Sequence, residues 1–285
     1  MGPDDLDADR AAAALMWWAE AGVGFTVSDT PVDRFAAQLS AAEPAAPARE
    51  APTARQPSAP FPASSPAPAT RAPLIVGARA EGAAAERAAA AQDLAGLREA
   101  MESFDGCALR KTATQLVFSD GVPGSRVMFV GEGPGGDEDR IGRPFVGRAG
   151  QLLDRMLAAI GLDRTKVYIA NVVPWRPPGN RTPTPEETQT CLPFIRRQIA
   201  FASPEILVCL GAHSAQTLLA VKSGITRARG SWMIYDVGDG RTIPAIAMLH
   251  PAYLLRTPSQ KRAAWADMRT LAAALREDSS PAGER

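Results

Sequence analysis

Four short apolar runs rich in β-branched residues recur through the second half of the chain, at residues 127–130, 167–173, 206–210 and 243–249. Runs of this length and composition predict buried β-strands. The apolar residues of the intervening and following segments have helical spacing, which predicts helices at residues 149–160, 185–202, 213–221 and 259–275. Because strands and helices alternate, we predict a three-layer α/β/α fold with a central four-stranded parallel sheet.

The first third of the chain has a different pattern. Residues 83–103 space their apolar side chains as a helix does, and we predict one helix there. Residues 40–73 contain nine prolines and twelve alanines, too little apolar surface to offset the entropy of ordering. The domain prediction is an N-terminal segment with one short helix (1–39), a mostly disordered Pro/Ala-rich linker (40–82), a catalytic domain (83–276) and a C-terminal tail (277–285).

The composition narrows the class of protein. The chain has 285 residues, of which 46% are hydrophobic, enough for one sizeable core. No stretch approaches the roughly 20 uninterrupted apolar residues of a membrane span, and the start of the chain is acidic, unlike a signal peptide. Three cysteines without a C-x-x-C pair argue against a disulfide framework. We therefore expect a cytoplasmic protein with reduced thiols and no contact with a membrane.

The net charge of zero conceals an asymmetry. Residues 104–276 contain 22 basic and 14 acidic side chains, whereas the flanking segments are acidic. A basic domain suits a partner with phosphates, since cations that neutralise phosphates release counterions. An ordinary solvated surface is the alternative interpretation.

Polar motifs follow the predicted strands, where parallel sheets bind ligands. The first is GEGPGGDEDRIGRPFVGRAG, residues 131–150. It lacks the G-x-G-x-x-G spacing of a dinucleotide loop, and its four acidic residues would repel a pyrophosphate. A neutral planar ligand is therefore favoured. Phe145, in this loop, is either a buried anchor or a ring for base stacking.

The second motif begins at Asn171, at the end of a predicted strand. Its carboxamide offers a donor and an acceptor, the complement of a base edge with N–H beside C=O, although a structural cap is the alternative. The proline-rich loop that follows carries Arg176 and Arg181, both available for phosphate. The loop ends at a predicted helix start, with Thr184 as cap and Glu187 three residues later.

The third motif is HPAYLLR, residues 250–256. An imidazole at a strand end, followed by bulky apolar residues and a cation, suggests a ligand contact beside an apolar wedge for a DNA stack. The other histidine, His213, is predicted to be structural.

Together the three motifs resemble a family-four uracil-DNA glycosylase over residues 104–275. The resemblance implies a monofunctional enzyme of base excision repair, which hydrolyses the N-glycosidic bond of flipped-out deoxyuridine and leaves an abasic site. The absence of lysine from the motif positions agrees with this, because a lyase reaction would need a Schiff base. The partner is then uracil-containing DNA, and we expect a monomer.

The resemblance also implies roles for individual residues. Phe145 stacks on the uracil and Asn171 binds its edge. His250 donates to the oxygen that gains charge, with a backbone N–H near Gly133. The residues that fill or brace the gap in the DNA stack are Leu254, Leu255 and Arg256.

Water activation is assigned less directly. Gly133 stands where other branches of the superfamily carry a catalytic aspartate. We expect the neighbouring Glu132 to orient the water and to stabilise the positive charge on the sugar. Glu138 is the second candidate for this task and, by the resemblance, also walls off the C5 methyl group of thymine.

The cofactor is the major departure from the family, which typically holds an iron–sulfur cluster on four cysteines. The corresponding positions here are Phe104, Cys107, Trp175 and Cys191. Because neither Phe nor Trp can coordinate iron, we predict a cluster-less branch without a metal, in which the two aromatic residues fill the space. Cys209 is predicted to lie in the core.

Two other functions stay open. One is a protein that binds uracil-containing or abasic DNA with little turnover and tight product retention, and recruits protein partners through its N-terminal segment. The other is a nucleotide-binding α/β domain unrelated to repair, which would require the three motifs to coincide by chance.

Overall fold

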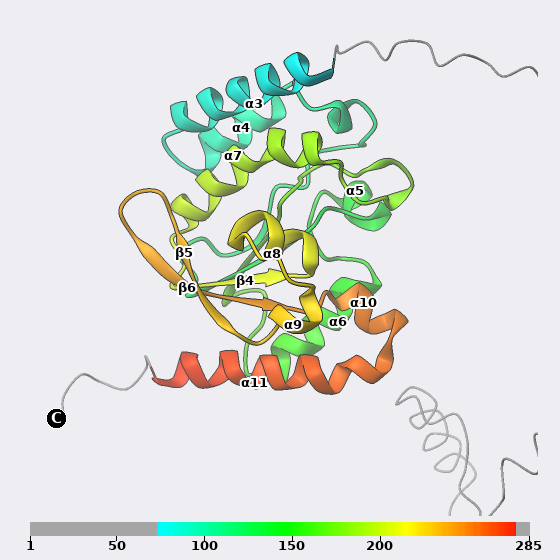
Figure 1. Ribbon diagram of the computed structural model, residues 1–285, viewed down its shortest axis with the longest axis vertical. Helices are drawn as coiled ribbons and strands as arrows, with labels where there is room; N and C mark the ends of the chain where they lie inside the picture. Colours follow the sequence, from blue (N-terminus) through cyan, green and yellow to red (C-terminus); the bar gives the residue numbers. More distant parts are fainter. Residues whose placement is uncertain (1–72, 278–285) are drawn as a thin grey trace, which may run out of the picture. The chain divides into compact units, whose positions relative to one another are not determined.

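The computed structural model describes residues 73–277, including the side chains of residues 79–276 (Figure 1). These residues belong to one compact unit, Ala67–Arg285. The predicted N-terminal segment, residues 40–72 of the predicted linker and the tail beyond residue 277 lie outside the described residues.

The four predicted parallel strands are confirmed and form the centre of the sheet. They lie side by side in the order β3 (Val167–Asn171), β2 (Val127–Gly131), β4 (Ile206–Leu210) and β6 (Thr242–Met248). The first three are buried along their whole length, which explains the continuous apolar runs in the sequence.

The sheet is wider than predicted, however, and it is mixed. Two antiparallel edge strands bring it to six: β1 (Asp120–Gly121) pairs with β3, and β5 (Trp232–Asp236) pairs with β6. The prediction of a four-stranded sheet is therefore corrected. The edges escaped it because β1 has only two residues and most of β5 is exposed.

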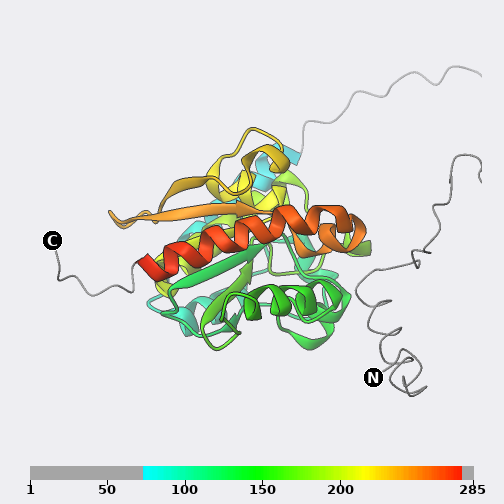
Figure 2. The same ribbon diagram turned by 90° about the horizontal axis from the view of Figure 1, so that it is seen from below.

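Helices cover both faces of the sheet (Figure 1). One face carries α3 (Pro73–Ala90), α4 (Leu94–Glu102), α7 (Pro185–Ala202) and α8 (Ala212–Leu219). The other carries α6 (Arg148–Ala158) and α11 (Lys261–Glu277), which lie in front of the sheet in Figure 2. Alternate residues of β2 face opposite ways: Met128 joins the core under α7, and Phe129 joins the core under α6.

The helix predicted at residues 83–103 is two helices. The chain breaks between α3 and α4, where the Asp93 side chain accepts a hydrogen bond from Gly96 N at 2.7 Å and so begins a new helix. Helix α3 also begins earlier than expected, at Pro73. Residues 73–82 are therefore helical, and the predicted linker boundary at residue 83 is wrong.

The other predicted helices are found within a few residues of their expected bounds. Helix α7 begins at Pro185, where Glu187 N donates to Thr184 Oγ1 (3.2 Å) and Thr184 N donates to the Glu187 carboxylate (2.8 Å). Short helices not predicted from the sequence are α5 (Gly136–Ile141), α9 (Ile225–Ala228) and α10 (Pro251–Arg256), with 3-10 turns at Ala108–Lys111, Pro178–Asn180 and Pro258–Gln260.

This topology brings the three motifs together. The last residue of β2, Gly131, pairs with Asn171 at the end of β3. His250 follows β6, at the same edge of the sheet. Within the described residues, no helix has the length and apolar character needed to cross a membrane.

Candidate active site

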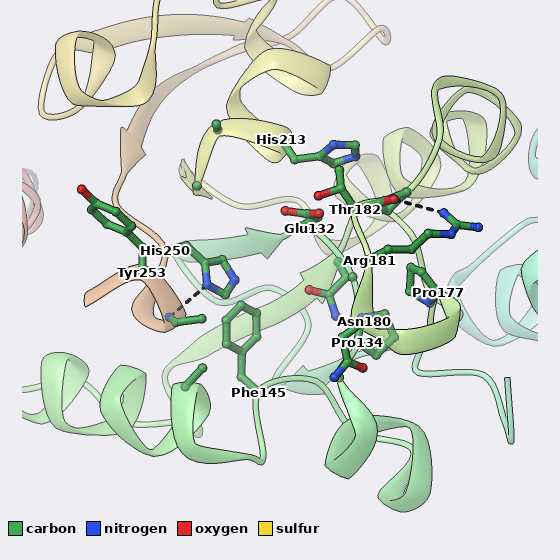
Figure 3. A pocket seen from close by; sticks show the side chains of 18 of the residues that line it. Glu132, Pro134, Phe145, Pro177, Asn180, Arg181, Thr182, His213, His250 and Tyr253 are labelled. Atoms are coloured by element: carbon green, nitrogen blue, oxygen red, sulfur yellow. Dashed lines mark hydrogen bonds between the residues drawn. The ribbon is translucent and has the colours of Figure 1, made fainter. Parts of the chain in front are cut away.

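A cavity of about 560 Å³ opens at the carboxyl edge of the parallel strands (Figure 3), a size typical of small-molecule sites. Eight of the predicted site residues line it: Glu132, Gly133, Glu138, Phe145, Asn171, Arg181, His250 and Arg256. The remaining three, Arg176, Leu254 and Leu255, do not.

Asn171 lines this cavity and has an unused hydrogen-bond acceptor. Its side chain is 4% exposed, and its Oδ1 has no hydrogen-bond partner among the described residues. An unpaired buried polar atom is costly, which indicates a group that awaits a ligand. Gly131 makes the arrangement possible, because a Cβ there would lie 2.5 Å from Asn171 Oδ1 and 2.6 Å from Phe145 Cζ.

Phe145 is buried and also lines the cavity. It is 5% exposed, as expected for an anchor, and base stacking on its ring stays a prediction. Its ring stacks against that of His250, with centroids 5.5 Å apart and planes at 29°. Its backbone is left-handed (φ +55°), which costs an aromatic residue about 1–3 kcal/mol. The surrounding structure must therefore hold it there.

The carboxylate of Glu138 is hydrogen-bonded to backbone N–H groups. Its Oε1 accepts from Val146 N (3.0 Å) and Gly147 N (2.9 Å), and its Oε2 accepts from Gly135 N (3.1 Å). The carboxylate thus joins the glycine-rich turn to the Phe145 loop. These three donors use most of its acceptor capacity, which favours Glu132 for water activation, and the second assignment, to Glu138, stays a prediction.

His250 is a neutral hydrogen-bond donor. It caps α10, and its Nδ1 accepts from Ala252 N at 3.1 Å, which places the ring proton on Nε2. Burial lowers the pKa of His250 to about 4, assisted by the positive charge of Arg256. The ring therefore remains uncharged at neutral pH.

Glu132 supplies the free carboxylate. It follows β2 and lines the cavity; its backbone carbonyl accepts from Val173 N, but its carboxylate makes no hydrogen bond or salt bridge with another described residue. This agrees with its predicted task, since no protein donor occupies the carboxylate oxygens.

His213 was missed by the sequence analysis. It lies in the first turn of α8 and lines the cavity near Glu132 (Figure 3). Its Nε2 lies 3.2 Å from Thr188 Oγ1, which itself donates to Thr184 O, so the ring is the donor in this pair. Burial lowers the pKa of His213, and the charge of Glu132 opposes the shift. Its position directly after β4, at the carboxyl edge, was the available signal.

The two leucines predicted to fill or brace the gap in the DNA stack differ in exposure. Leu254 is 1% exposed and packs with Leu249 and Ala264, so bracing is the one of the two predicted roles that its burial allows. Residues 251–256 form α10 rather than a loop, and its inner face takes Leu254. Leu255 is 37% exposed, and Arg256 is exposed as well.

The two arginines of the proline-rich loop have partners in the chain. Arg181 makes two hydrogen bonds to the Glu187 carboxylate, at 2.7 and 2.8 Å. Arg176 donates to Asn180 Oδ1 at 2.7 Å and lies 4.0 Å from Asp139. Their side chains remain 43% and 33% exposed, and their contact with DNA stays a prediction.

The four positions of the family's cluster ligands form a packed region of the core. Phe104 and Trp175 are almost fully buried, and the Phe104 ring meets Phe194 edge-on at 5.1 Å. The Cys191 thiol donates to Cys107 Sγ at 3.9 Å, which lowers the pKa of Cys107.

This donor set does not fit a four-thiolate cluster. Two of the positions are aromatic side chains that cannot coordinate iron, and nowhere in residues 79–276 do three or more potential metal ligands gather. Cys209 lies buried in β4, as predicted, and burial raises its pKa.

Comparisons with known proteins agree with this geometry. The family model described as the uracil DNA glycosylase superfamily matches residues 118–269. The type-4 uracil-DNA glycosylase of Thermotoga maritima is 43% identical over 164 residues, which cover 57% of this chain and 83% of the relative. The enzyme of the same type from Archaeoglobus fulgidus is 44% identical over 167 residues (57% and 82%). A type-5 uracil-DNA glycosylase of Pyrobaculum aerophilum is 30% identical over 176 residues (56% and 73%).

Proposed function

Because this chain belongs to the uracil DNA glycosylase superfamily, we propose that it is a monofunctional uracil-DNA glycosylase of base excision repair. It hydrolyses the N-glycosidic bond of flipped-out deoxyuridine and leaves an abasic site. The observation that carries the proposal is the buried, unpaired Oδ1 of Asn171 beside the Phe145 ring.

Recognition follows from the hydrogen-bonding pattern of uracil. The base presents N3–H between two carbonyl oxygens, so Asn171 Oδ1 accepts from N3 while its amide donates to O4. Cytosine has an acceptor at N3, which would leave Oδ1 facing a lone pair. Phe145 supplies the aromatic surface on which the flipped base stacks.

Bond cleavage leaves the electron pair of the N1–C1′ bond on uracil. His250 donates its Nε2–H to O2, which takes up part of this charge, with a backbone N–H near Gly133 as a second donor. A neutral donor is sufficient here, since uracil leaves as an anion and needs no proton at this step.

Glu132 acts on the sugar. Its carboxylate stabilises the positive charge that develops at C1′ and orients the attacking water. As the water oxygen bonds to C1′, the water proton passes to the carboxylate. No lysine belongs to the cavity lining, which supports hydrolysis without a lyase step.

Contacts with DNA surround the cavity. Leu255 is the side chain that enters the stack, next to Arg256 at the cavity rim. Arg176 and Arg181 approach phosphates. The proposal includes a monomer that acts in the cytoplasm and a protein partner that binds residues 1–39.

The enzyme belongs to a cluster-less branch of family four. The support is the pair of aromatic side chains packed where two thiolate ligands would be needed. Protein purified anaerobically is expected to contain no stoichiometric iron or sulfide and no visible cluster absorbance. Four iron atoms per chain would refute this assignment without affecting the proposed activity.

The activity is tested by single-turnover and multiple-turnover cleavage of labelled uracil-containing DNA, with alkali to reveal abasic sites. We expect strand breaks only after alkali. Glu132→Gln slows excision by about 10²–10⁴-fold and His250→Ala by about 10²–10³-fold.

Asp137→Asn is the matched control, because Asp137 is an exposed carboxylate of the same motif. A wild-type protein that binds this DNA without forming abasic sites would instead support the binding protein with little turnover. A stoichiometric burst that stalls would identify an enzyme limited by product release.

A further inference from the structure

The strained backbone of Phe145 is held from outside the cavity. The peptide bond that follows this residue has both of its polar groups bound by charged side chains. Arg164 Nη2 donates to the Phe145 carbonyl, and Glu138 Oε1 accepts from Val146 N at 3.0 Å. A cation and an anion thus fix the orientation of a single peptide plane.

Arg164 lies where it can hold the Phe145 backbone in place. Its Nη1 also donates to the Pro144 carbonyl at 3.1 Å, and the side chain is only 21% exposed. Gly150 leaves the necessary space, because a Cβ there would lie 1.6 Å from Phe145 O. Arg164 itself is absent from the cavity lining, so any effect on the base must pass through Phe145.

Two carboxylates contact the guanidinium. Asp120 Oδ2 lies 2.5 Å from Nη1, and Asp154 Oδ1 lies 2.8 Å from Nε. Asp120 is the more buried of the two, at 15% exposed against 46% for Asp154. It belongs to β1, the short edge strand, which therefore supports the guanidinium at the side nearer the core.

We propose that Arg164 is a positioning residue for uracil excision, which holds Phe145 in its left-handed conformation and so presents the ring to the flipped base. This inference rests on the proposed function. It assigns a task in the reaction to a side chain that does not contact the substrate.

The test compares Arg164→Lys with Asp154→Asn. Lysine keeps the charge beside Asp120, but a single ammonium group cannot reproduce the planar set of donors that reaches both backbone carbonyls. Asp154→Asn weakens the more exposed ion pair and leaves the contacts with Phe145 and Asp120 in place. It is therefore the matched control for loss of an ion pair at the same guanidinium.

Four quantities are measured on the full chain: the single-turnover excision rate, the inhibition constant of free uracil, the affinity for DNA with an uncleavable abasic analogue, and the 19F spectrum of 4-fluorophenylalanine placed at position 145. In Arg164→Lys we expect excision and uracil inhibition each to weaken by about tenfold, with a shifted or broadened 19F signal. Its affinity for abasic DNA stays within about twofold of wild type, as do all values for Asp154→Asn.

If the wild type is active and the two variants behave equally, the proposed role of Arg164 is wrong and the proposed function is unaffected. Parallel loss of uracil and abasic-DNA binding in Arg164→Lys would also overturn it, because that pattern indicates general destabilisation. If the wild type neither excises uracil nor binds it, the proposed function fails, and the inference fails with it.

Discussion

The chemistry of the cavity depends on which polar atoms are already hydrogen-bonded within the protein and which are available to a substrate. Two glutamates of one motif illustrate this. Both carboxylate oxygens of Glu138 accept backbone N–H groups, whereas the carboxylate of Glu132 has no hydrogen-bond partner in the described chain. Although the two residues are only six positions apart, Glu138 orders a loop and Glu132 faces the substrate.

The pKa of His250 leads to a prediction at the residue scale. In the folded protein its pKa is about 4, below the ordinary value of about 6.5. Between these two values the unfolded chain binds more protons, so the free energy of unfolding decreases as the pH falls. We expect this residue to account for about 3 kcal/mol of lost stability between pH 7 and pH 4.

The measurement is chemical denaturation of wild type and His250→Gln across this pH range, with 15N NMR of the untagged protein. The sequence has two histidines, so His213→Gln assigns both ring signals. A His250 ring that titrates near pH 6.5, or a pH dependence that survives His250→Gln, would contradict the prediction.

At the scale of elements, the two sides of α10 have different tasks: one packs against the core, and the other is available for contact with DNA. The helix turns Leu254 inward and Leu255 outward. Adjacent leucines of one motif therefore have different tasks, and a pair of matched substitutions distinguishes them.

We expect Leu254→Ala to lower the free energy of unfolding by about 2–5 kcal/mol, since it leaves a cavity in the core. Leu255→Ala changes it by at most about 0.5 kcal/mol but slows excision from double-stranded DNA by about tenfold, because the gap in the stack is no longer filled. Single-stranded DNA has no such gap, so its excision rate is expected to stay close to wild type. The measurements are denaturation curves and single-turnover rates on both substrates. Equal effects of Leu255→Ala on the two substrates would count against the wedge.

At the scale of the molecule, the catalytic unit begins at α3. Ala84 and Ala88 of this helix are buried in the core shared with α7. The linker boundary predicted at residue 83 would cut this helix, which begins at Pro73.

A chain that lacks residues 1–72 is therefore expected to excise uracil within about twofold of the full rate and to unfold at the same temperature. A chain that lacks residues 1–90 should unfold at a lower temperature, because it loses the buried face of α3. Thermal denaturation and single-turnover excision of the three proteins test this. Loss of activity on removal of residues 1–72 would show that the N-terminal segment takes part in catalysis or folding.

The sequence alone determined the central sheet and the position of the site. A strand buried on both faces must be a continuous apolar run, so β2, β3 and β4 could be predicted from the sequence. The motifs at the ends of β3 and β6 named Asn171 and His250, because parallel strands bring their carboxyl ends to one edge. The capping box at Thr184 was equally readable, since it depends on residues three apart.

Only the tertiary structure decided which groups meet across long distances in the chain. Local pattern could not show that Glu138 binds the backbone of the Phe145 loop or that Leu254 faces the core. Nor could it reveal β1, whose two residues carry no periodicity but bring Asp120 to Arg164. Hydrogen bonding and burial at these positions depend on three-dimensional neighbours, and sequence spacing does not specify them.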